Sequence, residues 1–411
     1  MAVNLNLAQA LPVAGVELVT IAAGIKVDGT PDMVIARVET GSTCAAVFTR
    51  NAFAAAPVTV AKENMQACGG AVRALLVNSG NANAGTGEPG IAMARKHCAA
   101  AAQAMSLPEN SVLPFSTGVI GQLLPDDIIV SGIAKAAELL AGDNTSAVSA
   151  WNEAARGIMT TDTHPKITSR KIEIDGHSVT ITGMAKGAGM IQPNMATMLS
   201  YVFTDASIAQ EDLQQALQEA VDVSFNAITV DSDTSTNDAC VLLATGAGSA
   251  ALTQGNANWS AFMDALIVVC EDLAQGIIRD AEGATKFISV HVSGGESIAE
   301  CKQVAYAVAN SPLVKTAMFA SDANVGRLLM AIGKAGIHDL DASRVSVSLD
   351  DVLAFEAGGI AEGYSEERGA AVMAEDEIDV FINLSRGQAS ATVYTSDLSH
   401  DYVSINADYR S

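Results

Sequence analysis

Short segments rich in strand-forming residues alternate with alanine-rich helical segments along the whole chain, and this alternation limits the fold class more than any other feature. Residues 72–78 (VRALLVN) have the composition of a buried strand. A glycine- and asparagine-rich loop leads from them to a predicted helix from about Ile91 to Met105. Because strands and helices follow no regular βαβ order, the sequence predicts layered sheets and helices of the α+β class rather than a doubly wound parallel sheet.

The second half of the chain continues this pattern. Ser207 and Ser260 are candidate N-caps of two helices, because apolar residues recur behind each of them at helical spacing. Further strands are predicted at 287–292, 378–384 and 391–395. The last two are separated by a Ser-Arg-Gly turn region, which predicts a hairpin. The segment TGMAKGAGMIQPN (182–194) holds three glycines and a proline, and it is the best candidate for a boundary between two halves.

The charge balance excludes several classes of partner. Lys and Arg total 23 against 46 Asp and Glu, a formal net charge of −23. Such an excess repels phosphate backbones and anionic lipid, so we expect neither nucleic-acid binding nor electrostatic membrane docking. The hydrophobic content of 49% with only 17% charged residues excludes a disordered chain. No uninterrupted apolar run reaches the length that crosses a bilayer.

The amino-terminal residues and the cysteines point to a cytoplasmic protein. The start, MAVNLNLAQALPVAG, lacks a basic region and interrupts its apolar stretch with Asn and Gln, unlike a secretory signal. The six cysteines form no CxxC pair, which is typical of reduced thiols in the cytosol rather than a disulfide frame or zinc site. They are Cys44, Cys68, Cys98, Cys240, Cys270 and Cys301.

Three local motifs suggest other chemistry, but each has a simpler interpretation. Residues 85–90 match the GxGxxG pattern of dinucleotide-binding loops, yet no regular βαβ units follow, so a structural turn is favoured. The tract DSDTSTND (231–238) lacks the glycine and glutamate of a calcium-binding EF-hand and predicts a polar turn with internal hydrogen bonds. His400 has an acidic neighbour and nearby serines, but a lone histidine more often makes an ordinary hydrogen bond.

The pair Ala196-Thr197 is the most reactive candidate in the chain. A threonine hydroxyl needs a neighbouring base to become a nucleophile, and a threonine at a chain start carries its own α-amino group for this purpose. Attack of the Thr197 hydroxyl on the Ala196 carbonyl, followed by hydrolysis of the ester, would create that start. Without further information, a buried strand threonine is the simpler alternative.

The surrounding sequence, KGAGMIQPNMATML, closely resembles the cleavage-site signature of the glutamate N-acetyltransferase family, also called ornithine acetyltransferases, of arginine biosynthesis. Further segments in the family's order resemble its other blocks, so the resemblance covers nearly the whole chain and favours the reactive interpretation of Thr197. These segments are NSGNANAGTG (78–87), PFSTGVIG (114–121), MTTDT (159–163), DSDTSTND, EGATK (282–286), SPLVKTA (311–317) and the carboxy-terminal GQASATVYTSDLSHDYVSINADYR (387–410).

The resemblance implies a precursor that cuts itself between Ala196 and Thr197. The products would be an alpha chain of residues 1–196 and a beta chain of residues 197–411 that starts with the nucleophile. These chains are expected to remain together as a heterotetramer with two copies of each. The implied fold has sheets sandwiched between helices, like that of self-processing acyltransferases related to the D-aminopeptidase group.

The implied reaction moves acetyl from N2-acetyl-L-ornithine to L-glutamate by a ping-pong route through an acetyl-threonine ester on Thr197. Thr117 and Gly118 would stabilise the oxyanion, one through its hydroxyl and the other through its backbone N–H. The residues implied to bind substrate are Thr160, Lys186, Thr197, Glu282, Asn406 and Ser411. One departure from the family pattern stands beside this set, since Ala281 occupies a place where many relatives have glycine.

Several alternatives remain open at the level of sequence. The family resemblance implies no metal and no organic cofactor, although acetyl-CoA is expected as a possible second acetyl donor, which would make the enzyme bifunctional. A self-cleaving aminopeptidase or amidase could use the same amino-terminal threonine with water as acceptor. A catalytically silent amino-acid-binding protein would never cut itself.

Overall fold

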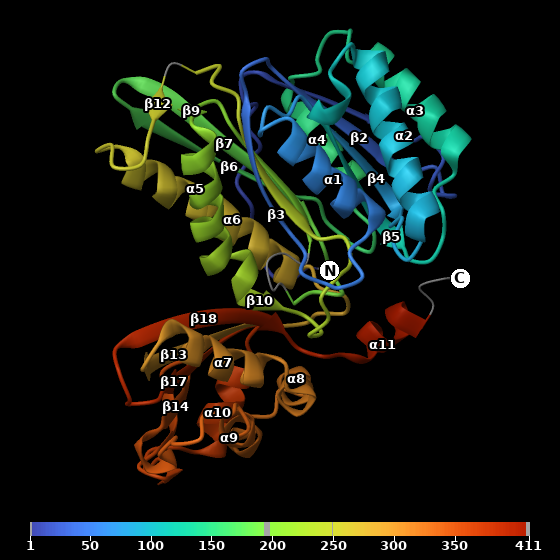
Figure 1. Ribbon diagram of the computed structural model, residues 1–411. Coiled ribbons are helices and arrows are strands. Elements are labelled where there is room, and N and C mark those ends of the chain that lie inside the picture. The colour runs from blue at the N-terminus through green and yellow to red at the C-terminus, as the bar shows by residue number, and fades with distance from the viewer. Residues whose placement is uncertain (1, 193–197, 249, 408–411) are drawn as a thin grey trace.

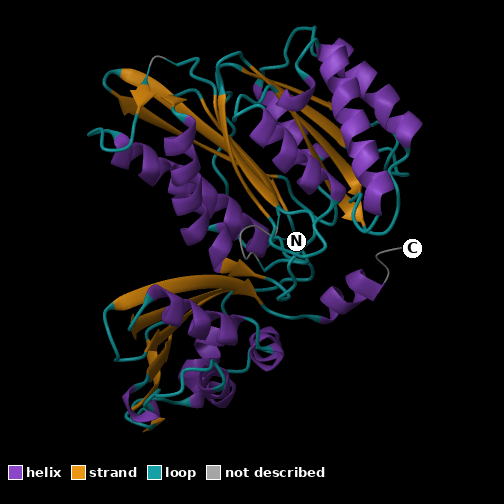
Figure 2. Cartoon of the chain, in the orientation of Figure 1, coloured by secondary structure: helices purple, strands orange, loops and turns teal. Residues whose placement is uncertain are grey.

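The computed structural model describes residues 2–192, 198–248 and 250–407, and the chain forms two bodies that lie one above the other in Figure 1. The upper body contains two large sheets and the helices of the first two thirds of the chain. The lower body contains one larger sheet with helices from the last third. Figure 2 shows that both bodies mix helices with sheets, so the predicted α+β class is confirmed.

The first sheet of the upper body contains β1 (Val16–Ile21), β2 (Met33–Val38), β4 (Ala74–Asn81) and β5 (Val112–Val119), in that order. Neighbouring strands are antiparallel except β4 and β5, which run parallel. Its outer face packs against α2 (Gly87–Met105) and α3 (Asp126–Leu139), with α1 (Ala56–Ala67) beside β5. The strand predicted at 72–78 and the helix predicted from Ile91 are confirmed by β4 and α2.

The second sheet of the upper body contains β3 (Thr43–Phe48), β11 (Ala239–Ala244), β8 (Leu199–Thr204), β7 (His177–Lys186) and β6 (Lys166–Ile174), in that order. All neighbours are antiparallel except β11 and β8. Its outer face packs against α5 (Gln210–Val223) and α6 (Trp259–Arg279). Both helices were expected, but neither predicted N-cap is correct. The N-cap of α6 is Asn258, and Ser260 lies inside that helix. Ser207 belongs to the short strand β9 (Ser207–Ile208), which pairs with β12 (Ala251–Leu252), and Ala209 precedes α5.

The inner faces of the two sheets pack against each other. Phe115 on β5 meets Tyr201 on β8 edge to face, with ring centroids 5.3 Å apart. Trp151, on α4 (Val148–Gly157), makes a similar contact with Phe203 at 5.3 Å. Aromatic pairs of this kind fill the space between sheets with large apolar surfaces. The layers therefore run helix, sheet, sheet, helix, which confirms the expected sandwich.

The lower body is built on a seven-stranded sheet with helices on one face. Its strand order is β10 (Ile228–Thr229), β18 (Ala389–Ser396), β13 (Phe287–Gly295), β17 (Glu377–Asn383), β14 (Ser346–Leu349), β15 (Val352–Glu356) and β16 (Gly359–Ile360). The helices of the lower body are α7 (Ile298–Ala309), α8 (Pro312–Phe319), α9 (Val325–Gly333) and α10 (Glu366–Met373). Short 3-10 helices lie at Glu109–Ser111, Phe225–Ala227 and Ala342–Arg344.

The hairpin predicted from the Ser-Arg-Gly turn is wrong. The strands at 378–384 and 391–395 exist as β17 and β18, but β13 lies between them and pairs with both. The connecting loop crosses the end of β13, where the backbone N–H of Arg386 donates to the Gly294 carbonyl at 2.7 Å. β13 is more fully buried than either of its neighbours, and it takes the position that a local hairpin would have closed.

The glycine-rich segment 182–194 is not a boundary between the two bodies. Its first residues belong to β7, which pairs with β8 in one sheet, so both sides of the segment are in the upper body. Gly183 instead permits close packing of α6, because a Cβ there would lie 2.8 Å from a Leu273 methyl group. Apart from the short strand β10, which pairs with β18 in the lower sheet, the chain passes to the lower body only after α6, near residue 286.

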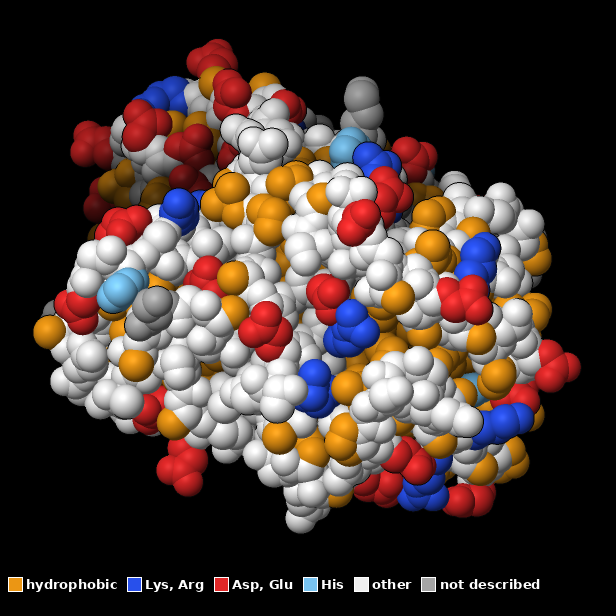
Figure 3. Space-filling model, turned by 90° about the horizontal axis from the view of Figure 1, so that it is seen from above, with side chains coloured by type: hydrophobic (Ala, Val, Ile, Leu, Met, Phe, Trp, Pro, Cys, Tyr) orange, Lys and Arg blue, Asp and Glu red, His pale blue; other side chains and the backbone are white. Residues whose placement is uncertain are grey.

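The surface agrees with the acidic composition. In Figure 3, Lys and Arg side chains are scattered singly among acidic ones on the upper face, with no broad basic patch there. Across the described ranges, no helix combines the length and the apolar character needed to cross a membrane. All six cysteines are free thiols.

Candidate functional site

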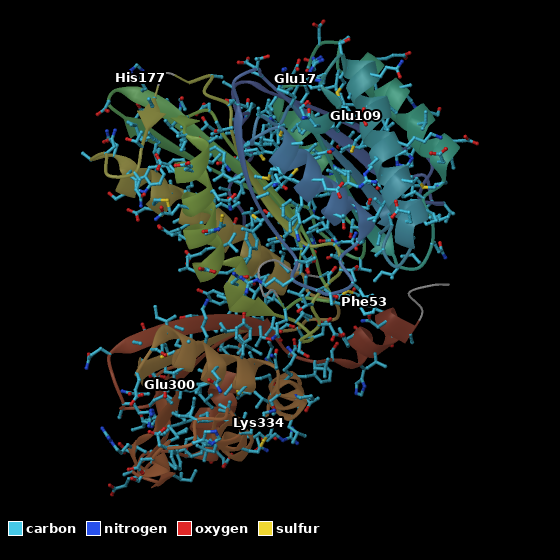
Figure 4. The ribbon with its side chains drawn as sticks, viewed as in Figure 1. Glu17, Phe53, Glu109, His177, Glu300 and Lys334 are labelled. Atoms are coloured by element: carbon cyan, nitrogen blue, oxygen red, sulfur yellow. The ribbon has the colours of Figure 1, made fainter. Side chains whose placement is uncertain are left out.

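A cavity opens at the lower edge of the upper body, where β5 and β7 end and β11 begins. It is bordered by the loop after α6 and by α11 (His400–Ala407), which crosses back from the lower body. Phe53, labelled in Figure 4, lies at this edge of the upper body. Six residues implied by the family resemblance line the cavity: Thr117, Gly118, Thr160, Lys186, Glu282 and Asn406.

Thr117 and Gly118 lie at the end of β5, beside the end of β4. Gly118 has a φ of 132°, and a Cβ at this position would lie 2.3 Å from the backbone carbon of Gly80. Any side chain here would force the parallel strands apart, so the close approach of β4 and β5 requires glycine. Thr117 is buried at 8% exposure, so its hydroxyl faces a sheltered space rather than open solvent.

Lys186, the last residue of β7, orients the Thr117 hydroxyl. Its Nζ donates to Thr117 Oγ1 at 3.1 Å. An ammonium group only donates, so the threonine oxygen must accept here, and its own O–H remains free to donate elsewhere. Burial lowers the pKa of Lys186, against the opposing influence of Asp162 nearby. Because an ammonium has three N–H groups, Lys186 can hold Thr117 and still face a bound carboxylate.

A buried ionic network holds two walls of the cavity together. Asp162 accepts from the backbone N–H of Thr160 at 3.0 Å and from that of Gly187 at 2.7 Å. Lys166 Nζ lies 2.6 Å from both Asp162 and Asp280, and all three side chains are buried. Burial alone would raise the pKa of Asp162, but the charges of the two lysines hold it well below its usual range. Sequence reasoning missed this network; the only signal was the position of Asp162 inside the block MTTDT.

Glu282 and Asn406 form the side of the cavity nearest the lower body. Asn406 Nδ2 donates to Glu282 Oε2 at 2.7 Å, which ties α11 to the loop after α6. The backbone N–H of Glu282 donates to the Ala188 carbonyl at 2.9 Å. Ala281 beside it is buried and is not among the described residues with positive φ. Alanine therefore fits this backbone, and the departure from the family pattern leaves the position of Glu282 intact.

The acidic tract at 231–238 contributes residues that were not expected in the site. It contains the predicted internal hydrogen bonds, for example from the backbone N–H of Asn237 to Ser235 Oγ at 3.2 Å. In addition, Asn237 Nδ2 donates to the carbonyls of Ala82 and Ser116 at 2.7 and 2.8 Å, which fastens the tract beside Thr117. Ser235, Asn237 and Asp238 line the cavity. Their only signal in the sequence was the family resemblance of the tract.

The remaining candidates of the sequence analysis either lie outside the described residues or do not line this cavity. Ala196, Thr197 and Ser411 lie outside the described residues. Met198, the residue after Thr197, lines the cavity. The glycine-rich loop at 85–90 contributes none of the described cavity residues, and α2 begins inside it. His400 packs edge to face on Phe319 at 5.7 Å. Among the described residues, no cluster of His, Cys, Asp or Glu could hold a metal ion.

Comparison with known proteins assigns the family. A family model described as the ArgJ family matches residues 17–411. The chain belongs to the ArgJ family. The resemblance read from the sequence blocks is therefore confirmed, and the family supports an acetyltransferase of arginine biosynthesis.

Solved structures of this family are similar to parts of the chain. The arginine biosynthesis bifunctional protein ArgJ from Bacillus halodurans is 41% identical over 51% of this chain and 99% of its own, with a TM-score of 0.49. The ornithine acetyltransferase from Mycobacterium tuberculosis, solved with ornithine, is 35% identical over 46% of this chain and 96% of its own, with a TM-score of 0.40. A third structure, the l-aminopeptidase d-ala-esterase/amidase from Ochrobactrum anthropi, is 12% identical over 67% of this chain and 88% of its own, with a TM-score of 0.36.

Proposed function

We propose that this ArgJ-family protein transfers acetyl from N2-acetyl-L-ornithine to L-glutamate, with Thr197 as the nucleophile. One observation carries the proposal. Six residues that the family resemblance implies, spread from residue 117 to residue 406, line a single cavity together with Met198. These residues are far apart in the chain, and the fold brings them to one cavity, as expected if they act in the same reaction.

The proposed reaction starts with self-cleavage between Ala196 and Thr197, which gives chains 1–196 and 197–411 that assemble as two copies of each. The Thr197 amine then takes the proton of its own hydroxyl as the oxygen attacks the acetyl carbonyl. The carbon–nitrogen bond breaks and ornithine leaves with that proton. Glutamate next attacks the acetyl-threonine ester through its amino group, and the hydroxyl of Thr197 is restored as N-acetylglutamate departs.

The oxyanion of each tetrahedral intermediate is stabilised by the Thr117 hydroxyl and the Gly118 N–H. The contact between Lys186 and Thr117 supports this role, because it leaves the threonine O–H free to donate into the cavity. The nearby positive charge also favours a developing negative oxygen.

Substrate binding is assigned to the remaining groups. Lys186 faces a substrate carboxylate, Glu282 faces an amino group of ornithine, and Thr160 and Asn406 orient polar atoms. Ser411 is proposed to complete this set. The reaction requires no metal or organic cofactor, and acetyl-CoA is proposed as a second acetyl donor. We place the enzyme in the cytoplasm, in line with its free cysteines.

Intact mass spectrometry after incubation with N2-acetyl-L-ornithine tests the proposal. The expected result is an acetyl adduct on the chain that begins with Thr197, followed by N-acetylglutamate when glutamate is added. The variant Thr197→Ala should give one full-length band on a denaturing gel and no transfer. Free acetate in place of N-acetylglutamate would support the aminopeptidase or amidase alternative, and normal transfer by Thr197→Ala would overturn the mechanism.

A further inference from the structure

Asp238 places an unpartnered carboxyl oxygen at the cavity. The side chain is only 2% exposed, and Oδ2 has no hydrogen-bond partner among the described residues. Four other buried side-chain atoms of the described chain share this condition, but none belongs to a residue that lines the cavity. A buried polar atom without a hydrogen-bond partner lowers the stability of the folded state. Such an atom calls for an explanation, and at a binding site a hydrogen bond to the ligand supplies one.

The backbone fixes Asp238 next to the proposed reaction centre. Its carbonyl accepts from the Thr49 N–H at 2.9 Å, and the N–H of the next residue, Ala239, donates to the Met198 carbonyl at 2.9 Å. Because β11 and β8 run parallel with Ala239 opposite Leu199, Asp238 lies opposite Met198, the residue that follows the proposed nucleophile.

The charged groups around Asp238 leave this oxygen available. Glu282, the other carboxylate lining the cavity, already accepts from Asn406, and Lys186 donates to Thr117. Burial raises the pKa of Asp238 well above its usual range, while Ser235, Lys186 and Thr49 act in the opposite direction. A carboxyl oxygen keeps lone pairs that accept hydrogen bonds whether or not the group is protonated.

The cavity thus offers donors for one end of an amide and an acceptor for the other. The Thr117 hydroxyl and the Gly118 N–H are the donors proposed above for a carbonyl oxygen, and Asp238 can accept from an N–H. A secondary amide presents these two groups on opposite sides of its carbon–nitrogen bond. An ester or thioester donor has a carbonyl oxygen but no N–H at the reacting bond, so it would contact Thr117 and Gly118 but would not donate to Asp238.

We propose that Asp238 Oδ2 binds the N–H of the acetamide donor and thereby positions its carbon–nitrogen bond for cleavage. The proposal rests on the function proposed above, and it adds a residue that distinguishes N-acetyl amino acids from esters and thioesters. Asp238 acts here as an acceptor that orients the substrate, and it supplies no group to the product.

The test compares two acetyl donors in the first half of the reaction. Formation of the acetyl-enzyme is followed with N2-acetyl-L-ornithine, which has the N–H, and with p-nitrophenyl acetate, which lacks it. Asp238→Ala should slow acetylation by the amide about tenfold or more, and acetylation by the ester less than about threefold. Asp238→Asn keeps an acceptor oxygen and should restore most of the rate with the amide.

Controls separate this result from damage to the fold. Asp233→Ala removes an exposed acid from the same tract and should change neither rate. Gel bands and thermal unfolding establish that each variant is folded and processed. If Asp238→Ala does not fold or is not processed, Asp238→Ser is used instead. The serine side chain is shorter than that of aspartate, so this variant also removes the acceptor oxygen from the position of Oδ2.

If Asp238→Ala loses the same factor in acetylation rate with the amide and with the ester, the proposal is overturned and Asp238 has a structural role. If neither rate changes, Asp238 has no role in acetylation and the proposal is also overturned. If the wild-type protein forms no acetyl-enzyme with the amide at all, the proposed function fails first, so the two failures are distinguishable.

Discussion

Replacing Thr117 by valine tests the arrangement at the end of β5. Valine has nearly the same shape as threonine, so the buried packing is kept while the hydroxyl is lost. Two interactions disappear together: the proposed donor to the oxyanion and the acceptor of Lys186 Nζ at 3.1 Å. Loss of the oxyanion donor lowers the rate of acetyl transfer, and loss of the contact with Lys186 lowers the free energy of unfolding.

The magnitudes follow from the chemistry of each contact. Loss of one oxyanion donor typically lowers kcat by about 10²–10³, or roughly 2.7–4 kcal/mol of transition-state stabilisation. Loss of a hydrogen bond to a charged group costs about 1.5–3 kcal/mol of stability. Because the missing acceptor favoured the charged form of Lys186, the pKa of Lys186, which burial already lowers, should fall further in Thr117→Val.

Steady-state kinetics with acetylornithine and glutamate, together with urea unfolding, measure both effects. The expected result is a large fall in kcat with a nearly unchanged KM, since the donor acts mainly in the transition state. Combining Thr117→Val with Lys186→Met should cost less than the sum of the single changes, because the two side chains are in contact. Thr392→Val is a matched control: it removes a strand hydroxyl that contacts His291 Nδ1 at 2.9 Å in the lower body.

The reasoning would be refuted if Thr117→Val kept its kcat within about fivefold of the wild type while remaining folded and processed. A similar loss of kcat in Thr392→Val would also refute it, because the effect would then not belong to the cavity.

Three further predictions concern the supports of the site and the lower body. Gly118→Ala should destabilise the protein by about 2–4 kcal/mol and abolish transfer, because its Cβ would overlap the backbone of β4; a lower urea midpoint checks this, and a wild-type midpoint would contradict it. Lys166→Met should lower the free energy of unfolding by about 3–5 kcal/mol, since it leaves two buried carboxylates without their cation; a loss below 1 kcal/mol in urea unfolding would contradict the network. Burial lowers the pKa of Lys315 to about 8, below the roughly 10.4 of an unfolded chain, so the folded state binds fewer protons between these values and stability should rise with pH there. Comparison with Lys315→Met across this range checks the sign, and a fall in wild-type stability relative to the variant would contradict it.

Local patterns predicted the elements well and their partners poorly. The strand at 72–78 and the helices behind Ser207 and Ser260 follow from apolar spacing, which depends on neighbours in the chain. The hairpin prediction failed because strand pairing is decided by competition among all strands, and β13 lies between β17 and β18 and pairs with both. The boundary failed because glycine marks close packing as readily as a linker, as it does at Gly183.

Some residues of the candidate site were named from the sequence, whereas the positions and contacts of others became known only from the structure. Thr117, Glu282 and Asn406 were named from family blocks, and all three line the cavity. The roles of Asp162 and Asp238 could not be read from the blocks that contain them. An aspartate in a polar tract resembles any solvated turn residue until its burial and its partners are known.

The order of apolar and polar residues by itself determined the α+β class and several of the helices and strands, because these depend on spacing along the chain. The family followed from the residues of its sequence blocks. Only the tertiary structure decided which strand separates β17 from β18, which carboxylate links Thr160 to Gly187, and which carboxyl oxygen at the cavity has no partner. These depend on contacts between separate elements, such as Asp162 with Gly187 or β13 with β17. Such contacts are set by packing of the layers rather than by any local preference.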